Sequence, residues 1–322
     1  MLGAIRAVTY CVPDLRAIER AYVDELGYRV VARGYVGAEH ARSWGAPASE
    51  GLATVLLGPA SGEAVYLRFI EDKDAAGWAA LQSFGWNVTE FVVADVDALA
   101  TRLEGGAFRI IGPPKALTRF PMIRAMQTLG PAGECCYFTE VGPGSGLELA
   151  AARSFVGRVF IVVAAGPDAD ALFAPYATFA NSIDPPVATP VGVISAAHGL
   201  PSDTLHRHGL VRLIQGTLVE LDEYPRSARP RACIENKLPP GMAIVTFDVD
   251  AARVHDFTHS VHHELVGARE HSLGQQGFIA PPSACELPGS CGLSGCLRGA
   301  AGELIEIAGT AAGHAPRDAG TR

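Results

Sequence analysis

The chain has 322 residues, enough for two domains that each bury a hydrophobic core. Of these residues 48% are hydrophobic and 19% are charged, which is typical of a globular protein and excludes a disordered one. The formal net charge of −8 argues against a nucleic-acid partner, and no stretch of about 18 apolar residues predicts a membrane span.

The N-terminal segment and the cysteines both favour a cytoplasmic protein. The first residues hold one arginine, Arg6, and no apolar run typical of a signal peptide. The seven cysteines are odd in number and include the neighbours Cys135 and Cys136. Such a set suits free thiols in a reducing compartment better than a disulfide framework.

Four segments of the chain begin with a short run rich in β-branched and aromatic residues, which predicts a strand. The runs are RAVTYCVPDL from Arg6, NVTEFVVADV from Asn87, RVFIVVAAG from Arg158 and IVTFDVDAA from Ile244. A helix-compatible stretch follows each run. The first and last of these stretches end at Gly27 and Gly267, as expected of helix C-caps.

The four segments also close alike. Their closing runs are GEAVYL from Gly62, GECCYF from Gly133, GTLVEL from Gly216 and GELIEI from Gly302. Glycine- and proline-rich hairpin signals and short strands lie between the opening and closing runs. The repeated unit is therefore a strand, a helix and about three antiparallel strands, and the sequence predicts four copies of it.

The segment GPGSG, from Gly142 to Gly146, divides the chain near its middle. It does not complete the phosphate-binding pattern G-x-G-x-x-G, and no βαβ unit surrounds it, so we interpret it as a linker. We expect one pair of modules in residues 1–145, a second pair in residues 152–310, and a disordered tail in residues 311–322.

The repeated βαβββ unit, with an opening strand of the form h-x-h-x-V-x-D and a closing strand after glycine, resembles the vicinal-oxygen-chelate superfamily. This superfamily includes glyoxalase I, extradiol ring-cleaving dioxygenases, methylmalonyl-CoA epimerase and bleomycin-resistance proteins. The resemblance covers residues 3 to about 310. It implies an α+β fold in which two modules form one cupped mixed β-sheet, a half-barrel, with the helices outside. Small molecules would bind in the two cups.

The resemblance also identifies positions for a metal ion, which metal-dependent members hold with a His or Gln in the opening strand and a Glu in the closing strand. The matching opening-strand positions carry Ala7, Val88, Arg158 and Ile244. None of these four side chains is a metal ligand, since three are apolar and one is a permanent cation. The matching closing-strand positions carry Tyr66, Tyr137, Glu220 and Glu306. We therefore expect no metal cofactor.

Two histidines provide one alternative to the expected absence of a metal ion. His206 and His208 alternate onto one face of a predicted strand, and an approach of either to Glu220 would restore a metal site. Four further histidines lie at helical spacing and are expected on an exposed helix face: His255, His259, His262 and His263.

In the first half of the chain, strand alternation directs a set of polar side chains into one expected cavity. This set is Glu90, Arg68, Tyr66, Tyr137 and Thr139. The two tyrosines would donate hydrogen bonds to a developing oxyanion in place of a metal ion. The alternative is a buried Glu90–Arg68 ion pair without a functional role. In such a pair each charge neutralises the other, because isolated buried charges are costly.

Two further runs of the first half add candidates at the rim of this cavity. The predicted loop AEHARSW contributes Trp44 and His40, which can act as an acid or a base near neutral pH. The run IRAMQ contributes Gln127 and Arg124, and an arginine can anchor a carboxylate or carbonyl by paired hydrogen bonds.

The second half offers a different set, Arg158, Glu220 and Glu306. Two carboxylates and a guanidinium in one cavity would form a proton-transfer site, since neighbouring like charges raise the pKa of one carboxylate. The alternative is a former metal site that Arg158 neutralises and that is kept only for structure.

We favour an enzyme, a metal-independent lyase or isomerase acting on a small, largely apolar oxygenated or aromatic substrate. Glu90 or His40 would serve as the base, and Tyr66, Tyr137 or Arg68 would stabilise the oxyanion. One alternative is a binding protein that sequesters a hydrophobic compound. Another is a metal-dependent enzyme like glyoxalase or an extradiol dioxygenase, although the dioxygenase needs two histidines and a carboxylate. The expected partner is a small molecule, and a homodimer is left open.

Overall fold

The structure is a computed structural model. It describes residues 2–145, 148–177, 179–250, 283–284, 287–288 and 293–310. Among these residues no helix has the length and apolar character needed to cross a membrane. The expected histidine-bearing helix, with His255, His259, His262 and His263, and the tail at residues 311–322 lie outside the described residues.

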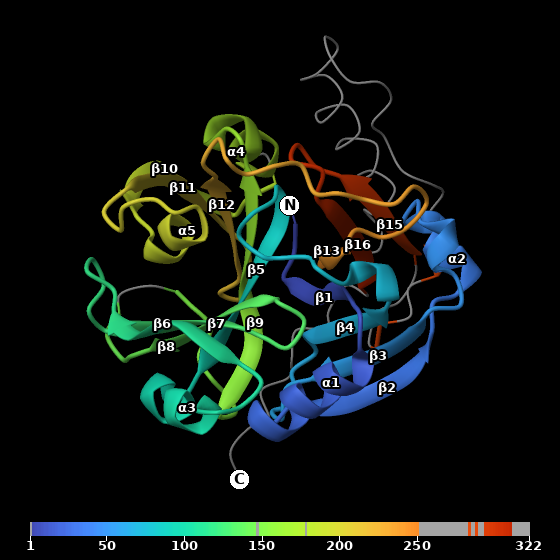
Figure 1. The fold of residues 1–322 in the computed structure, drawn as a ribbon, viewed down its shortest axis with the longest axis horizontal. Helices are drawn as coiled ribbons and strands as arrows, with labels where there is room; N and C mark the ends of the chain where they lie inside the picture. The colour runs from blue at the N-terminus through green and yellow to red at the C-terminus, as the bar shows by residue number, and fades with distance from the viewer. Residues whose placement is uncertain are drawn as a thin grey trace.

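Four strand-rich modules follow one another along the chain (Figure 1), as predicted. The first holds β1 (Ile5–Val12), α1 (Leu15–Arg20), the π-helical turn η1 (Ala21–Glu25), β2 (Arg29–Tyr35), α2 (Ala38–Ser43), the 3-10 turn η2 (Pro47–Ser49), β3 (Ala53–Gly58) and β4 (Tyr66–Glu71). The 3-10 turn η3 (Lys73–Ala75) leads to the second, with β5 (Gly85–Val93), α3 (Val96–Leu103), β6 (Arg109–Ala116), β7 (Ile123–Leu129) and β8 (Cys135–Val141). The third holds β9 (Val156–Gly166), α4 (Ala169–Ala177), β10 (Ser182–Pro190), α5 (Gly192–Ala197), β11 (Leu205–Arg212) and β12 (Leu218–Glu223). The described part of the fourth holds β13 (Gly241–Asp250), β14 (Ser283–Ala284), β15 (Leu293–Arg298) and β16 (Leu304–Thr310).

The strands form two eight-stranded mixed sheets that curl into half-barrels (Figure 1), which confirms the predicted fold class. Sheet 1 has the order β14-β15-β16-β13-β1-β4-β3-β2, and sheet 2 has the order β10-β11-β12-β9-β5-β8-β7-β6. Two opening strands pair antiparallel at the centre of each sheet, β1 with β13 and β5 with β9. Each opening strand has the closing strand of its own module as its parallel neighbour on the other side.

The sheets combine modules that are not the expected pairs. Sheet 1 joins the first module to the fourth, and sheet 2 joins the second to the third. The expectation that modules one and two share a sheet is therefore wrong, although the limits 1–145 and 152–310 as domain boundaries stay a prediction. All four opening strands carry the same apolar pattern, so the sequence indicates that opening strands pair but not which ones meet.

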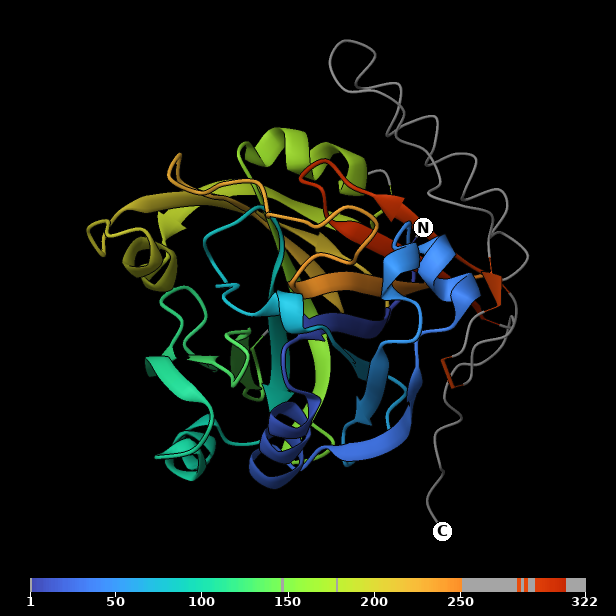
Figure 2. The ribbon, with the colours of Figure 1, turned by 45° about the vertical axis from the view of Figure 1, so that its right-hand side comes forward.

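Strands β1 and β13 of sheet 1 run beside β5 and β9 of sheet 2 (Figure 2). The main hydrophobic core contains buried side chains from all four of these strands. The ring of Trp86 on β5 packs against Phe247 on β13, with the ring centroids 6.3 Å apart. The Trp86 Nε1 also donates a hydrogen bond of 2.7 Å to the Leu304 carbonyl. Helices α1, α3 and α4 bury apolar side chains in the same core, which leaves the opposite face of each sheet free to form a cup.

The four repeated glycines have a common structural cause. Each lies in the turn before a closing strand, and their φ angles are +78° at Gly62, +82° at Gly133, +65° at Gly216 and +85° at Gly302. Only glycine adopts this left-handed conformation without a steric penalty. Gly27, at +73°, ends the first helical segment in the same way, so this predicted C-cap is confirmed.

Candidate functional site

Each sheet presents one face away from the shared core, and a short helix lies over it. On sheet 1, Trp44 at the end of α2 donates a hydrogen bond of 2.9 Å to Glu306. On sheet 2, Ser195 of α5 forms a hydrogen bond of 2.9 Å with His206. We call these faces the first cup and the second cup. The first carries Ala7, Tyr66, Arg68, Thr246 and Glu306, and the second carries Val88, Glu90, Tyr137, Thr139, His208, Glu220 and Asp222.

The polar side chains expected in one cavity are divided between the two cups. Arg68 and Tyr66 lie on β4 in sheet 1, whereas Glu90 and Tyr137 lie on β5 and β8 in sheet 2. The alternative of a Glu90–Arg68 ion pair is therefore wrong. The division follows from the pairing of the modules, because the first two modules belong to different sheets.

Three side chains contact the carboxyl group of Glu306 within the first cup. It is 1% exposed, and it accepts hydrogen bonds from Trp44 Nε1 at 2.9 Å and Thr246 Oγ1 at 2.7 Å. Arg68 Nη1 lies 3.6 Å from its Oε2, and the Arg68 guanidinium stacks on the Trp44 ring at 5.1 Å. These partners hold the buried carboxyl group in one position and occupy part of its hydrogen-bonding capacity.

His40 lies beside this group, but not in the expected loop. The run AEHARSW folds as helix α2, and the residue His40 is only 5% exposed. His40, Trp44 and Arg68 line a cavity of about 160 Å³ between α2 and strands β2, β3 and β4. A buried histidine is not the rim residue that the sequence predicted, although it does line a cavity.

The second cup gathers three carboxylates and one imidazole. Glu90 comes from β5, Glu220 and Asp222 from β12, and His208 from β11. His208 Nδ1 lies 3.4 Å from Glu220 Oε1. The ligand atoms of His208, Glu220 and Asp222 all lie within 4.8 Å of one another. The approach of His208 to Glu220, which the sequence left as a reservation, is therefore observed.

Burial and mutual repulsion shift the acid–base properties of these groups. Burial, together with the nearby Glu220 charge, raises the pKa of Glu90 to about 8, although a hydrogen bond from Thr139 Oγ1 opposes the shift. Burial and the Glu220 charge also raise the pKa of Asp222 well above its usual range. The hydrogen bond to Glu220 raises the pKa of His208. Near neutral pH Glu90 is therefore mostly protonated, and it lies in the same cup as the contacting pair of His208 and Glu220.

The backbone pairing beside Glu90 contains an irregularity. Glu90 pairs with Ile161 of β9, but the next residue, Phe91, pairs with Val159, so Phe160 is an extra residue in the strand. Such a bulge redirects side chains and is common next to active sites. On the other side of Glu90, Tyr137 is its direct partner on β8, which places a phenol beside the carboxyl group.

The second cup also fits a divalent cation. One imidazole and two carboxylates are ligands that such ions accept, and Asp222 Oδ1 is buried without a hydrogen-bond partner in the described part of the chain. The other imidazole nitrogen of His208 contacts Thr189 Oγ1 at 3.1 Å, an outer contact of the kind that orients metal-binding histidines. The structure therefore does not support the expected absence of a metal.

Asp222 was missed by the sequence interpretation, although a signal for it exists. It lies two residues after Glu220 on β12 and thus shares its face. His206, by contrast, points at Ser195, and burial lowers its pKa. It is not part of the cluster.

The arginines predicted for the site lie elsewhere. Arg124 of β7 forms a paired ion contact of 2.8 Å with Asp97 of α3, on the side away from the second cup. Gln127 is the direct partner of Tyr137 and is partly buried on the cup side.

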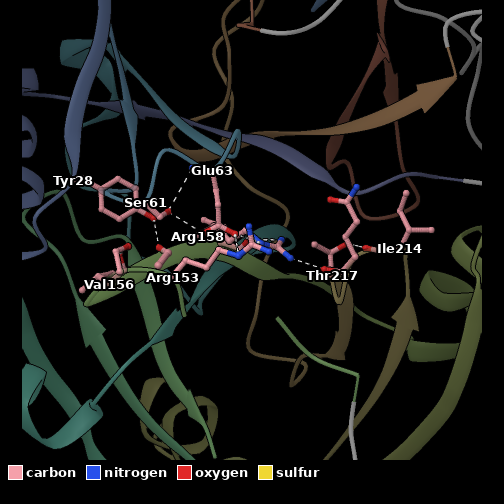
Figure 3. A network of polar contacts seen from close by, with 12 residues as sticks. Tyr28, Ser61, Glu63, Arg153, Val156, Arg158, Ile214 and Thr217 are labelled. Carbon is pink, nitrogen blue, oxygen red and sulfur yellow. Dashed lines mark hydrogen bonds and ion pairs between the residues drawn. The ribbon is translucent and has the colours of Figure 1, made fainter. Parts of the chain in front are cut away.

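Arg158 serves a contact between the sheets (Figure 3). Its Nε lies 3.3 Å from Glu63, which precedes β4 of sheet 1, and its Nη2 donates to the Gln215 carbonyl at 2.5 Å. The expectation that Arg158, Glu220 and Glu306 share one cavity is wrong. The two glutamates lie in different sheets, and Arg158 pairs with neither.

Comparisons with known proteins agree with this architecture. No family model and no curated protein sequence matches the chain. Among solved structures, glyoxalase I from Zea mays has a TM-score of 0.59 at 12% identity, covering 95% of this chain and 92% of its own. A protein from Bacillus subtilis subsp. subtilis str. 168, named "putative dioxygenase", has a TM-score of 0.61 at 14% identity, covering 96% and 85%. At these identities the likeness shows the four-module fold and assigns no residue.

Proposed function

We propose that this chain, which has the fold of the vicinal-oxygen-chelate superfamily, is an enzyme that moves a proton on a small oxygenated substrate in the second cup. The single observation that carries the proposal is Glu90, a buried carboxyl group on the cup face with a pKa of about 8. A group with a pKa near the operating pH is an efficient general acid or base. The reaction class is a lyase or an isomerase acting on a largely apolar or aromatic compound.

The neighbours of Glu90 suit this chemistry. At neutral pH Glu90 is mostly protonated and donates its proton, whereas above pH 8 it accepts one. Burial raises the pKa of Tyr137, so its phenol stays protonated and can donate a hydrogen bond to a developing oxyanion. The Tyr224 hydroxyl and Asp222 Oδ1, both buried, have no hydrogen-bond partner among the described residues, so polar groups remain for a substrate.

The first cup is a weaker candidate for this reaction. Its carboxylate, Glu306, is held by Trp44, Thr246 and Arg68. Three side chains already contact this carboxyl group, whereas Glu90 has one such partner, Thr139. The roles sequence reasoning gave to His40, Tyr66 and Arg68 in the same reaction as Glu90 are therefore not proposed again.

Proton transfer can be tested before the natural substrate is identified. The full chain is incubated in D2O with a panel of small α-hydroxyketones, α-ketoaldehydes and aryl ketones, and deuterium incorporation is measured by mass spectrometry. We expect catalysed exchange of a proton next to the carbonyl for at least one compound. Glu90→Gln should lower that rate by about 10²-fold or more, since this is the usual contribution of a general acid–base group.

Glu140→Gln is the matched control, because Glu140 follows Thr139 on the same strand but points to the other side, where it accepts a hydrogen bond from Val96 of α3. It should keep the exchange rate. Exchange at full rate in Glu90→Gln would refute the proposal. A compound that binds tightly but is recovered without deuterium would support sequestration instead.

A second candidate, a metal-dependent enzyme, is favoured by the geometry around Asp222. His208, Glu220 and Asp222 would hold the ion, and their ligand atoms lie within 4.8 Å of one another. A divalent cation would supply charge stabilisation to a substrate oxygen when bound. A dioxygenase of the two-histidine type is not favoured, because the cluster includes a single histidine.

Metal binding can be measured without an activity. Protein treated with a chelator is titrated with Co²⁺, whose visible spectrum reports its ligands, and with Zn²⁺ and Mn²⁺ in competition. If the metal candidate holds, one equivalent binds, and His208→Ala weakens binding by about 10-fold or more, as expected for a lost ligand. His198→Gln, a change in a histidine that instead contacts Ser227 and the Leu81 carbonyl, should have no effect. Absence of uptake, or uptake that ignores His208→Ala, would remove this candidate.

A further inference from the structure

We infer that the first cup contains a binding site for a small monocarboxylate, in the cavity of about 160 Å³ beneath α2. The observation behind this inference is the state of the Arg68 guanidinium, which lines the cavity. The site lies in sheet 1, whereas Glu90 and Glu220 lie in sheet 2. The inference therefore does not depend on the function proposed for the second cup.

Arg68 is a buried cation without a hydrogen bond to any residue that the structure describes. It is 9% exposed, and its Nη1 is fully shielded and lacks an acceptor. The guanidinium forms an ion pair with Glu306 at 3.6 Å, longer than a hydrogen bond, and stacks on Trp44 at 5.1 Å. A guanidinium has five N–H donors, and donors left unsatisfied in a buried site are costly.

Glu306 does not supply the missing acceptor. Its oxygens already accept from Trp44 Nε1 and Thr246 Oγ1, and these bonds hold the carboxylate beyond hydrogen-bond reach of Arg68. The Trp44 ring in turn supports one face of the guanidinium. The fork of donors is thus held in position by its neighbours, and its natural complement is the pair of coplanar oxygens of a carboxylate.

The size and lining of the cavity define the rest of the ligand. At about 30 Å³ for each water in the liquid, the space equals about five waters. Leu56, Leu287 and the Trp44 ring supply apolar walls, which suit a short alkyl chain. A phosphate or dicarboxylate would bring a second negative charge towards Glu306, so a monoanion is favoured. The expected class is a carboxylic acid of a few carbon atoms.

Calorimetric titration of the full chain with propionate tests the site, and propionamide is the matched neutral compound of the same shape. We expect saturable binding of propionate and about 10-fold or weaker binding of propionamide, because the amide lacks the charge and one acceptor. Arg68→Lys should weaken propionate binding by about 10-fold, since an ammonium group has no planar fork. Leu56→Trp, which keeps the Arg68–Glu306 pair and fills the cavity, should abolish binding even if Arg68→Lys alters folding.

Two controls locate the binding. Arg33→Lys changes a cation at the rim of the same cavity that is already paired with Glu19 at 2.6 Å, and it should leave the affinity unchanged. Glu90→Gln should also leave it unchanged, because that change is in the other cup. The inference is overturned if propionate does not bind, if propionamide binds equally well, if Arg68→Lys and Leu56→Trp have no effect, or if Glu90→Gln weakens binding as much as they do.

Discussion

Two buried glutamates of this protein show how neighbours decide what a carboxyl group can do. Glu306 has two hydrogen-bond donors and a guanidinium around it. Glu90 accepts one hydrogen bond, from Thr139, and faces the negative charge of Glu220. Glu306 is therefore held in place by three partners, whereas burial keeps a proton on Glu90 near neutral pH, as a group that exchanges protons requires.

The raised pKa of Glu90 predicts a pH-dependent stability. Its pKa rises from 4.5 to about 8 on folding, so the folded state binds the proton more tightly than the unfolded state. The free energy of unfolding is then highest below pH 4.5 and falls as the pH approaches 8. Between these limits the wild type should lose up to about 5 kcal/mol more than Glu90→Gln, at about 1.4 kcal/mol for each pH unit.

Urea unfolding of both proteins at a series of pH values measures this difference. Comparing the two curves removes the contribution of other groups, such as Glu134, whose pKa burial raises to about 7. If the free energy of unfolding depends on pH in the same way for wild type and Glu90→Gln, the pKa of Glu90 is not raised on folding.

At the scale of elements, a tyrosine–glutamate hydrogen bond joins the helical segment of one module to the turn before the closing strand of another. This contact occurs twice. Tyr22, which follows α1, donates a hydrogen bond of 3.2 Å to Glu134, and Tyr176 of α4 donates one of 2.9 Å to Glu303. Each glutamate also accepts from a backbone N–H of its own turn at 2.8 Å. The glutamate after the repeated glycine is thus a structural feature in these two modules, and not a catalytic one.

Tyr22→Phe and Tyr176→Phe test this role. Each change leaves a buried glutamate without one donor, so each should lower the free energy of unfolding by about 1–3 kcal/mol. Tyr35→Phe is the control, because Tyr35 is 74% exposed, and it should change stability by less than about 0.5 kcal/mol. Equal free energies of unfolding for all three variants in chemical denaturation would contradict a stabilising role of these hydrogen bonds.

At the scale of the molecule, the pairing of modules one with four and two with three makes the two halves of the chain interdependent. In each half the opening strands β1 and β5, or β9 and β13, have their central partners in the other half. These strands are buried almost throughout. Separation would therefore expose long apolar strand edges.

We predict that fragments 1–145 and 148–322, expressed separately, do not form folded monomers but assemble when mixed. Calorimetry should show a cooperative transition only for the mixture, and light scattering should show a one-to-one complex. A cooperative transition in either fragment as a monomer would contradict this pairing.

The sequence was sufficient for the fold class, because the four opening runs and the four glycines with positive φ recur at matching positions. It was not sufficient for the site. Glu90 and Arg68 alternate onto cup faces as expected, but the pattern shared by all opening strands does not specify which strands pair. Arg158 was misassigned because its partner, Glu63, lies in the turn before β4 of the other sheet and far away in sequence.

Glu90 holds an exchangeable proton near neutral pH in the proposed site, and an NMR titration of its carboxyl carbon measures this property. Protein labelled with ¹³C at glutamate Cδ is followed from pH 4 to pH 9, and Glu90→Gln identifies the signal that belongs to Glu90. We expect a midpoint near pH 8 for that signal. A midpoint near 4.5, the value of an ordinary glutamate, would contradict it.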